Sequence, residues 1–321
     1  MSSMTTLNTT VLERTAVWSN QLKEILDDEL MAMQYVNWMS DFPDGDTFNI
    51  PTINDQAQVD NYLEDEAVRY RPLDTGNFTF QINKYLSSGH YITKKAMQDL
   101  YYSQQLMSTF VPAQERAIME HVESNVLNLQ AEQTSNNANT INGRAHRFTA
   151  SGTDNVLSVS DFSYANLAAN QANIPTTGRV AIVDPSAAFH LENSTNLINF
   201  SNNKSWEGIV TEGISTGMKF KYNVFGWDVY ISNRLPTTTS DTALRPYDAG
   251  DAVNASGFKA NLFFSTDTPG GTFIGAWRQM PEVDQEWNKD FQRWEFLTTA
   301  RYDTALYRPE GLIVIPASTT V

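Results

Sequence analysis

TKKAMQDLYYSQQLMSTFVPAQERAIMEHVESNVLNLQAEQ, residues 93–133, holds the longest run of helical periodicity in the 321-residue chain. Pro112 lacks an amide hydrogen and fits best in the first turn of a helix, so we expect a short helix over 93–108 and a longer one that begins near Val111. In the longer helix, which we call the spine helix, apolar residues recur on one side: Ile118, Val122, Val126 and Leu129. At 1.5 Å per residue, roughly 20 residues make a rod of about 30 Å. Such a helix also suits an ordinary globular enzyme.

The N-terminal part of the chain is predicted to be an arm that carries a helix. Residues 1–12 are rich in Ser and Thr and offer little to pack. From Glu13 the pattern becomes helical, and we expect the helix to end near Met39, before a cluster of turn residues at 40–45. Its apolar stripe consists of Trp18, Leu22, Ile25, Met33 and Val36. We expect this stripe to contact a neighbouring subunit.

Between the arm and the spine helix the sequence predicts a long excursion made of two antiparallel strands. Residues 48–50 and 78–83 alternate as strands do. The intervening stretch 54–74 is too charged to form a core, with Asp55, Asp60, Glu64, Asp65 and Glu66 against Arg69 and Arg71. A two-stranded ribbon is marginal in water by itself. It therefore lies either on its own domain as a surface hairpin or on a neighbouring chain.

The C-terminal half is predicted to be dominated by strands. Residues 134–140 read as a boundary, and residues 179–183 as a short buried strand followed by a helix that Asp184-Pro185-Ser186 opens. Residues 193–217 are loop-rich, 220–231 form strand with a break at Gly226, and 233–256 are irregular. Four more strands are expected at 258–265, 273–280, 291–306 and 312–315.

Charge and composition exclude several classes of function. The formal net charge is -15 and no basic run occurs, which argues against a sequence-independent duplex binder. The chain has no cysteine, so it can form neither disulfides nor thiolate metal sites. The N-terminus has no secretory pattern, and no apolar run approaches about 18 residues. We therefore expect a protein that is made and folds in a cytoplasm, without a membrane partner.

The search for chemistry predicts no catalytic, cofactor-binding or metal site, and hence no enzyme. His90, His121, His146 and His190 are scattered without metal-ligand spacing, and His121 is expected to be a helix-surface or packing residue. Asp41, Asp44 and Asp46 flank a turn but lack the rest of a calcium loop. The acidic set of Asp60, Glu64, Asp65 and Glu66 could suggest paired carboxylates. We interpret it as a solvated surface.

Four aromatic residues in the C-terminal strands allow two interpretations: Trp277, Trp287, Trp294 and Tyr302. They could form a platform for base stacking. Because no Lys or Arg residues are interleaved in the manner of such platforms, we interpret them as sheet core or subunit contact.

The order of these elements resembles that of the major capsid proteins of tailed bacteriophages with the Hong Kong 97-type fold. LERTAVWSNQLKEILDDELMAMQYVNWMSDFPDGDTFNIP, residues 12–51, looks especially like the coat proteins of short-tailed and cyanobacterial phages. The resemblance implies an α+β fold in five parts. These are an N-terminal arm at 1–45, an extended loop at 46–83, a first peripheral part with the spine helix at 84–142, an axial domain at 143–257, and a second peripheral part of returning strands at 258–321.

The resemblance also implies a function. The subunit would self-assemble into the hexamers and pentamers of an icosahedral shell that encloses double-stranded DNA without sequence-specific binding. A portal protein, and separate scaffolding and decoration proteins, would be its partners in the virion, and the shell would assemble in the cytoplasm of a bacterial host. The arm helix expected from Glu13 leaves no room for a scaffolding segment of about a hundred residues.

The loop at 46–83 contains no lysine, and Lys84 lies only at its base, so the shell is expected to be noncovalent. Two alternatives stay open. One is a bacterial encapsulin, which uses the same fold around a protein cargo. The other is a carbohydrate-acting enzyme that would use the acidic residues at 55–66.

Overall fold

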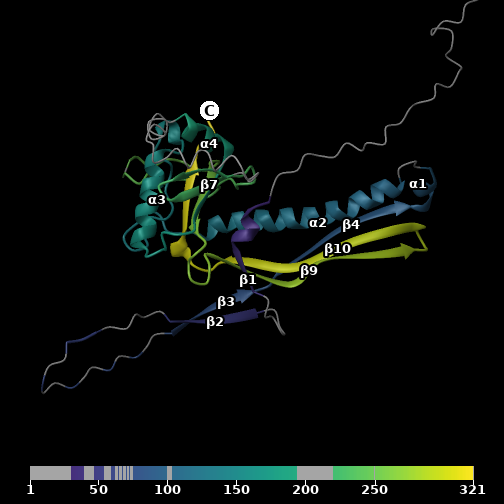
Figure 1. The fold of residues 1–321 in the computed structure, drawn as a ribbon, viewed down its shortest axis with the longest axis horizontal. Coiled ribbons are helices and arrows are strands. Elements are labelled where there is room, and N and C mark those ends of the chain that lie inside the picture. Colours follow the sequence, from purple (N-terminus) through teal and green to yellow (C-terminus); the bar gives the residue numbers. More distant parts are fainter. Residues whose placement is uncertain are drawn as a thin grey trace, which may run out of the picture.

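Two sheets and a two-stranded ribbon form the framework of the computed structural model, in an elongated arrangement (Figure 1). The structure describes residues 30–39, 47–53, 59–61, 64, 67, 70, 72, 75–99, 103–193, 220–248 and 250–320. Helices and strands are mixed throughout these ranges, which confirms the predicted α+β class.

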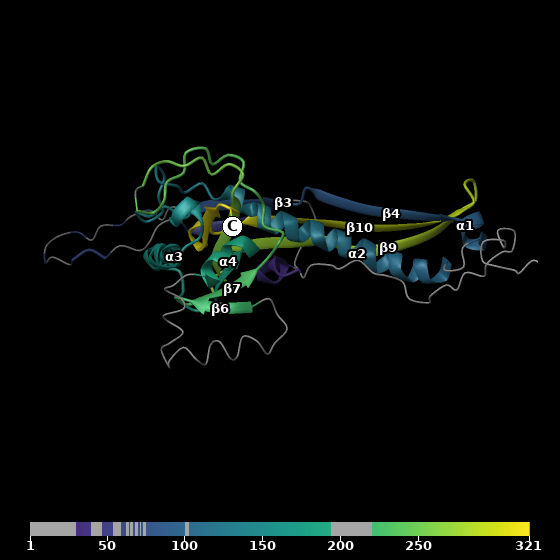
Figure 2. The same ribbon diagram turned by 90° about the horizontal axis from the view of Figure 1, so that it is seen from above.

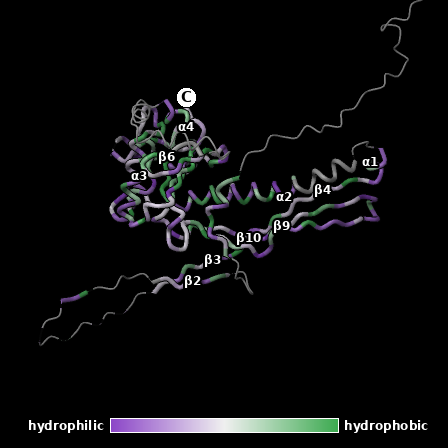
Figure 3. The backbone as a smooth tube through the Cα atoms, viewed as in Figure 1, coloured by the Kyte–Doolittle hydropathy of each residue, from purple (hydrophilic) through white to green (hydrophobic). Residues whose placement is uncertain are grey.

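The first sheet is long and lies along one helix. Its order is β1-β9-β10-β4, and only β1 runs parallel to its neighbour. The strands are β1 (Val36–Met39), β4 (Lys84–Thr93), β9 (Phe273–Asn288) and β10 (Arg293–Leu306). Helix α2 (Ser103–Asn128) follows one face of this sheet for most of its length, and α1 (Lys94–Asp99) lies at the far end (Figures 1 and 2). Hydrophilic and hydrophobic residues alternate along β9 and β10 (Figure 3), as expected when one face is covered.

The second sheet has the order β11-β8-β5-β7-β6. Its strands are β5 (Arg179–Val183), β6 (Phe220–Val224), β7 (Trp227–Ile231), β8 (Lys259–Ser265) and β11 (Leu312–Ala317). Helices α3 (Val159–Gln171) and α4 (Pro185–Glu192) cover one face. The Asp184 carboxylate accepts the Ser186 amide at 3.1 Å and caps α4 at the position that the sequence predicts.

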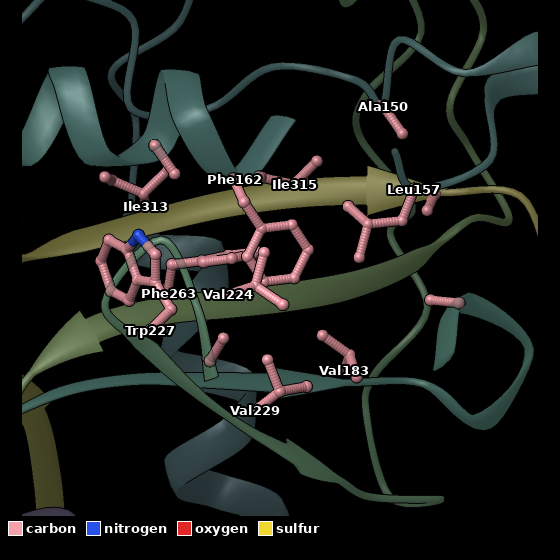
Figure 4. Packing of buried hydrophobic residues seen from close by; sticks show 14 of the residues in the cluster. Ala150, Leu157, Phe162, Val183, Val224, Trp227, Val229, Phe263, Ile313 and Ile315 are labelled. Atoms are coloured by element: carbon pink, nitrogen blue, oxygen red, sulfur yellow. The ribbon is translucent and has the colours of Figure 1, made fainter. Parts of the chain in front are cut away.

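Both faces of the second sheet are buried, in two separate cores. Alternate residues such as Val183, Phe263 and Ile315 meet α3 and α4, and Trp227 and Phe263 pack edge to face at 5.3 Å (Figure 4). The intervening residues of the same strands face the C-terminal end of α2 and the root of the arm. The second core therefore joins the two sheets into one body.

The remaining elements are the ribbon and four short 3-10 helices. The ribbon consists of β2 (Thr47–Ile53) and β3 (Thr75–Gln81), which pair antiparallel with Phe48 opposite Phe80. This confirms the predicted strand pair. The 3-10 helices are η1 (Ala32–Tyr35), η2 (Leu129–Glu132), η3 (Thr153–Asn155) and η4 (Pro309–Gly311).

The strands expected in the C-terminal half are all present, and the break at Gly226 is the tight turn between β6 and β7. Gly226 adopts a φ of 85°, in the left-handed region that favours glycine. Residues 233–248 and 250–256 form no named strand, as predicted. The loop-rich segment 193–217 falls outside the described residues from 194 onward.

The prediction that Pro112 separates two helices is wrong. Helix α2 runs without interruption from Ser103 to Asn128, so Pro112 lies ten residues into it. The break between α1 and α2 comes earlier, after Asp99. Proline is unfavourable inside a helix because it removes one main-chain hydrogen bond, but tertiary packing along the rest of α2 offsets that cost.

The predicted end of the arm helix at Met39 is also wrong. Residues 1–29 lie outside the described range, and the described remainder forms η1 followed by strand β1. Val36 and Trp38 alternate with polar Asn37, which is typical of a strand. Pairing with β9 then stabilises a strand here in place of the predicted helix. Strand β4 was not anticipated either, although exposed Tyr85, Ser87 and Gly89 alternate with half-buried residues.

The predicted returning strands at 258–321 divide between the two sheets. Strands β9 and β10 belong to the long sheet, whereas β8 and β11 flank β5 in the second sheet. A signal for this division is present in the sequence. β8 and β11 are buried almost throughout, as β5 is, and such continuous burial is typical of a strand covered on both faces.

We predict that Pro112→Ala stabilises the folded subunit. Alanine supplies the missing amide donor in the interior of α2, so the free energy of unfolding should rise by up to about 3 kcal/mol. Urea denaturation of the two proteins measures the difference. The mirror variant Ala117→Pro, at an exposed position of the same helix, should lose a similar amount. If Pro112→Ala instead lowers the free energy of unfolding, the fixed backbone geometry of the proline stabilises α2 and the prediction is wrong.

Candidate assembly surfaces

The root of the arm is held by one buried carboxylate. Glu123 of α2 is fully buried, and its Oε1 accepts the main-chain N–H groups of Met31 and Ala32 at 3.1 and 2.9 Å. Its Oε2 accepts the N–H group of Met33 at 3.1 Å. These N–H groups lie at the start of η1, where the helix offers them no carbonyl partner and where negative charge is favoured. Glu123 therefore fixes where the arm leaves the body.

Beyond this anchor, an aromatic stack fixes β1 against the long sheet. The rings of Trp38 and Trp277 stack with centroids 5.0 Å apart, and the Trp38 indole N–H donates to the Met33 carbonyl at 3.1 Å. Gly275 lies opposite Trp38, where a Cβ would come within 2.7 Å of the ring. The glycine therefore gives the indole the space that it occupies.

Polar side chains join α2 to the long sheet. The buried Gln114 amide lies 2.6 Å from His90 Nδ1, donates to the Phe296 carbonyl at 3.3 Å, and accepts the Thr298 hydroxyl at 2.9 Å. The helix position is thus set by directional bonds, which tolerate less sliding than apolar packing does.

A second polar cluster on the same helix surrounds Tyr302, which is fully buried. His121 Nδ1 lies 3.1 Å from the Tyr302 hydroxyl, and the Asn125 amide contacts the same oxygen. Burial raises the pKa of Tyr302 to about 12, so the phenol stays protonated at neutral pH. The structure confirms Tyr302 as sheet core and places His121 at the helix surface with a packing role, both as predicted.

The ribbon is anchored at its base and exposed beyond it. Ile50, Phe78 and Phe80 pack against Ile274 and Ala276 of β9. Beyond the paired strands, Val59 and Tyr70 are 96% and 93% exposed. The base of the ribbon therefore folds back on its own chain, as one of the two predicted alternatives states, and contact of the part beyond it with a neighbouring chain stays a prediction.

The end of the long sheet farthest from the second sheet, which we call the distal end, carries aromatic side chains on both faces. On the α1 side, Trp287 and Trp294 pair across β9 and β10 with ring centroids 5.3 Å apart and are half-buried. On the opposite face, the Arg293 guanidinium lies 4.5 Å from the Tyr91 ring centroid and 4.6 Å from that of Phe291. Those two rings are 60% and 65% exposed.

Buried polar groups also connect the second sheet to its surroundings. Arg147 forms a two-pronged pair with Asp241, at 2.9 and 2.6 Å, and donates to the Gln130 carbonyl at 2.7 Å. This pair ties the irregular segment before β8 to the end of α2. Nearby, burial lowers the pKa of His146, and its Nδ1 donates to the Arg144 carbonyl at 3.2 Å.

Only some of the candidate catalytic residues fall in the part of the chain that the structure describes. Among the described residues, no group of three His, Asp or Glu side chains could hold a metal ion. Of the acidic set only Asp60 and Glu64 are described, and both are exposed; Asp41, Asp44, Asp46, Asp55, Asp65 and Glu66 lie outside the described ranges. No helix in those ranges is long and apolar enough to cross a membrane.

Sequence reasoning missed the residues that organise these surfaces. In the sequence, Glu123 is one of several acidic residues on the faces of the spine helix that do not carry the apolar stripe. Gln114 and Arg147 were not singled out. Their partners are 90 or more residues away along the chain in most cases, or are main-chain groups. Glu123 follows directly after Val122 of the apolar stripe. This position is the one feature of the sequence that indicates burial of its side chain.

Several solved structures with the same arrangement are phage capsids. The capsid structure of the cyanophage P-SCSP1u matches with a TM-score of 0.72 at 16% identity, covering 95% of this chain and 93% of that one. The capsid of cyanophage Pam1 matches with a TM-score of 0.70 at 13% identity, covering 95% and 96%. The fold is therefore that of a Hong Kong 97-type capsid subunit.

The family is shown by the sequence itself. The profile of the family described as phage capsid protein matches residues 77–315, which is most of the chain. The chain belongs to this family and is a bacteriophage major capsid protein with a structural role. A search of curated proteins found no significant match.

We predict that Glu123→Gln loosens the root of the arm. A glutamine retains one acceptor oxygen but turns an NH₂ group toward an N–H donor, and it removes the charge that strengthens these bonds. Hydrogen bonds to charged groups contribute about 1.5–3 kcal/mol, so the free energy of unfolding should fall by roughly that amount. Urea denaturation measures it, and hydrogen exchange should show faster exchange at Met31 to Met33. Glu115→Gln, at an exposed position on α2, is the matched control. Equal stability of both variants would contradict this role.

Proposed function

We propose that the protein assembles with itself into the hexamers and pentamers of an icosahedral shell that encloses double-stranded DNA. Membership of the phage capsid family supports the shell. The observation that carries self-assembly is the ribbon, whose base packs on its own chain through Ile50, Phe78 and Phe80. Val59 and Tyr70 beyond that base are almost fully exposed. A ribbon that long needs a neighbouring surface to lie on.

The five-part division of the chain is part of this proposal, with one amendment. The arm, the extended loop and the first peripheral part keep their proposed boundaries, whereas β8 and β11, which lie within 258–321, are reassigned from the second peripheral part to the axial sheet. The shell is held together noncovalently, since the loop at 46–83 lacks lysine. A net charge of -15 is consistent with a wall that does not bind its DNA tightly.

A structural role without catalysis accords with the family. We propose a portal protein, and separate scaffolding and decoration proteins, as partners in the virion. Assembly would take place in the cytoplasm of the bacterial host.

An encapsulin-like compartment is the alternative that a specific observation favours. The holo-SrpI encapsulin complex from Synechococcus elongatus PCC 7942 matches with a TM-score of 0.58 at 10% identity and covers 100% of this chain and 98% of that one. The two functions share a fold and differ in contents. No further observation on the described residues supports a carbohydrate-acting enzyme that would use the acidic segment 55–66.

The contents of particles distinguish the two functions. We expect the chain, expressed with the other structural proteins of its phage, to form closed particles in electron micrographs that protect double-stranded DNA from nuclease. The empty shell of the chain alone, treated in the same way, is the control. Particles that instead contain an enzyme and no DNA would support the encapsulin-like alternative. A chain that stays monomeric under all assembly conditions would contradict both.

We predict that the ribbon beyond its base provides adhesion between subunits. Replacing residues 54–74 with an Asn-Gly turn should keep the circular-dichroism spectrum and the solubility of the subunit, because the base contacts of Ile50 and Phe78 remain. Shells should be weakened or absent, since small losses recur at every subunit contact. Thermal dissociation of particles followed by light scattering measures the effect.

A chain with residues 54–74 replaced by a Gly/Ser segment of equal length is the matched control for this experiment. It keeps the reach of the ribbon and removes its side chains. If the shortened protein forms particles as heat-stable as the parent, the ribbon is only a surface hairpin.

A further inference from the structure

The outer side of β4 is an open strand edge in the part of the chain that the structure describes. β4 pairs with β10 on one side and forms the border of the long sheet (Figure 2). The N–H group of Lys94, one residue past β4, donates to the Gln292 carbonyl at 2.9 Å. Because antiparallel strands bond through alternate residues, the main-chain groups of the odd-numbered residues from Tyr85 to Tyr91 point away from β10. They form a row of donors and acceptors with which one more strand can pair.

The opposite edge of the same sheet is protected against such pairing. β1 pairs with β9 only at residues 273–276, so the rest of β9 is also an edge in the described chain. That edge contains Pro281, which lacks an amide donor, and three acidic residues: Glu282, Asp284 and Glu286. Proline and charged side chains are common means by which an edge strand avoids further pairing. β4 contains neither proline nor acidic residues, and its one lysine, Lys84, is paired with Asp303 at 3.3 Å.

A second copy of β4 fits the open edge in antiparallel orientation. With a two-fold axis at Ser88, Tyr85 of each copy lies opposite Tyr91 of the other. These two side chains are 61% and 60% exposed in the subunit, and cross-strand aromatic pairs stabilise sheets. The residues between them, Ser87 and Gly89, are small and also lie opposite each other. About eight main-chain hydrogen bonds form in this register, all through groups that point away from β10.

The charges of the neighbouring strand are compatible with this register. On β10, Arg301 lies beside Tyr85 and Glu295 lies beside Tyr91. The two-fold arrangement therefore brings the Arg301 end of one copy toward the Glu295 end of the other. Within β4 itself Lys84 is the only Lys, Arg, Asp or Glu residue, so no like charges face each other across the new strand pair.

Helix α2 leaves room for the second copy. Its side with Val122 and Glu123 is covered by the root of the arm, which leads to β1 at the opposite edge of the sheet. At about 100° per residue, Ala113 and Ala117 lie on the side toward β4, and both are exposed. α2 contacts both β4 and β10 through Gln114. Two copies of α2 would therefore be no closer than about 10 Å, a distance that packed helices adopt.

We propose that β4 pairs antiparallel with β4 of a second copy of this chain, about a two-fold axis at Ser88, and thereby joins the long sheets of two subunits into one. The proposal rests on the proposed shell function and names one contact within it. A strand paired with its own copy is a closed two-fold contact, which cannot build a ring by itself. Contacts between unlike surfaces build the rings, and the β4 pair joins a subunit of one ring to a subunit of the next.

A single cysteine at the axis tests this pairing. The chain has no cysteine, so Ser88→Cys introduces the only thiol. Ser88 would face its own copy in a pair without mutual hydrogen bonds, where Cα atoms are about 4.5 Å apart and a disulfide can form. Assembled particles are oxidised mildly, and the chains are separated without reductant. Ser87→Cys is the matched control, because Ser87 is more exposed yet would lie about 9 Å from its own copy, too far for a disulfide.

We expect linked dimers from Ser88→Cys particles at several times the yield from Ser87→Cys particles, with particles of normal appearance in both cases. Normal particles without this excess would overturn the β4 pair and leave the shell function intact, and the edge would then be open or bound to a different protein. Failure of the parent chain to form any particle would overturn the shell function together with this contact.

A second variant tests the contact without a thiol. Ser87→Pro removes one outward N–H group and leaves the hydrogen bonds between β4 and β10 in place. The subunit should keep its circular-dichroism spectrum, and the yield of particles should fall several-fold. Particles of this variant at the yield of the parent would overturn the contact, even if the Ser88→Cys chain failed to assemble.

Discussion

The fold depends on how the second face of the five-stranded sheet is covered. β5, β8 and β11 are apolar on both sides, and α3 and α4 cover only one of them. The other side packs against the last turn of α2, through Val126 and Leu127, and against Leu129 of η2. Full burial of such side chains contributes about 1.5–3 kcal/mol each. This contact fixes the direction of α2 relative to the second sheet, and with it the direction in which the long sheet extends.

α2 also makes contacts of a different kind. Gln114, Glu123 and Asn125 bond to the long sheet and to the root of the arm, beside the buried apolar side chains of Ile118 and Val122. Apolar burial stabilises without specifying an exact position, and directional bonds to buried partners do specify one. The apolar contacts of α2 therefore stabilise the fold, and its hydrogen bonds to buried partners fix its position against the long sheet. A capsid subunit needs both, because small errors in alignment are repeated at every contact in a closed shell.

Local sequence signals predicted the parts of this fold that form locally. The β6–β7 turn at Gly226 and the helix cap at Asp184 depend on neighbouring residues, and both are confirmed. The predicted interruption of the spine helix at Pro112 was wrong because packing of α2 after the proline outweighs one missing hydrogen bond. Glu123 and Arg147 could not be identified as buried anchors, since their partners are remote in sequence. The apolar run of β11 indicates a strand that is covered on both faces, whereas Lys259 and Asn261 interrupt the apolar pattern of β8.

The two incompletely covered surfaces of the subunit differ from each other and lie toward opposite ends of the elongated body (Figure 1). One is the ribbon, whose base packs through Phe78 and Phe80 while Tyr70 is exposed. The other is the distal end, with Trp287 and Trp294 on one face and Arg293 between two aromatic rings on the other. A two-fold symmetric dimer covers a surface with a copy of itself, so surfaces this different are better matched by head-to-tail contacts. Head-to-tail contacts produce rings when the rotation between copies closes, and rings of five and six are the units from which an icosahedral shell is built.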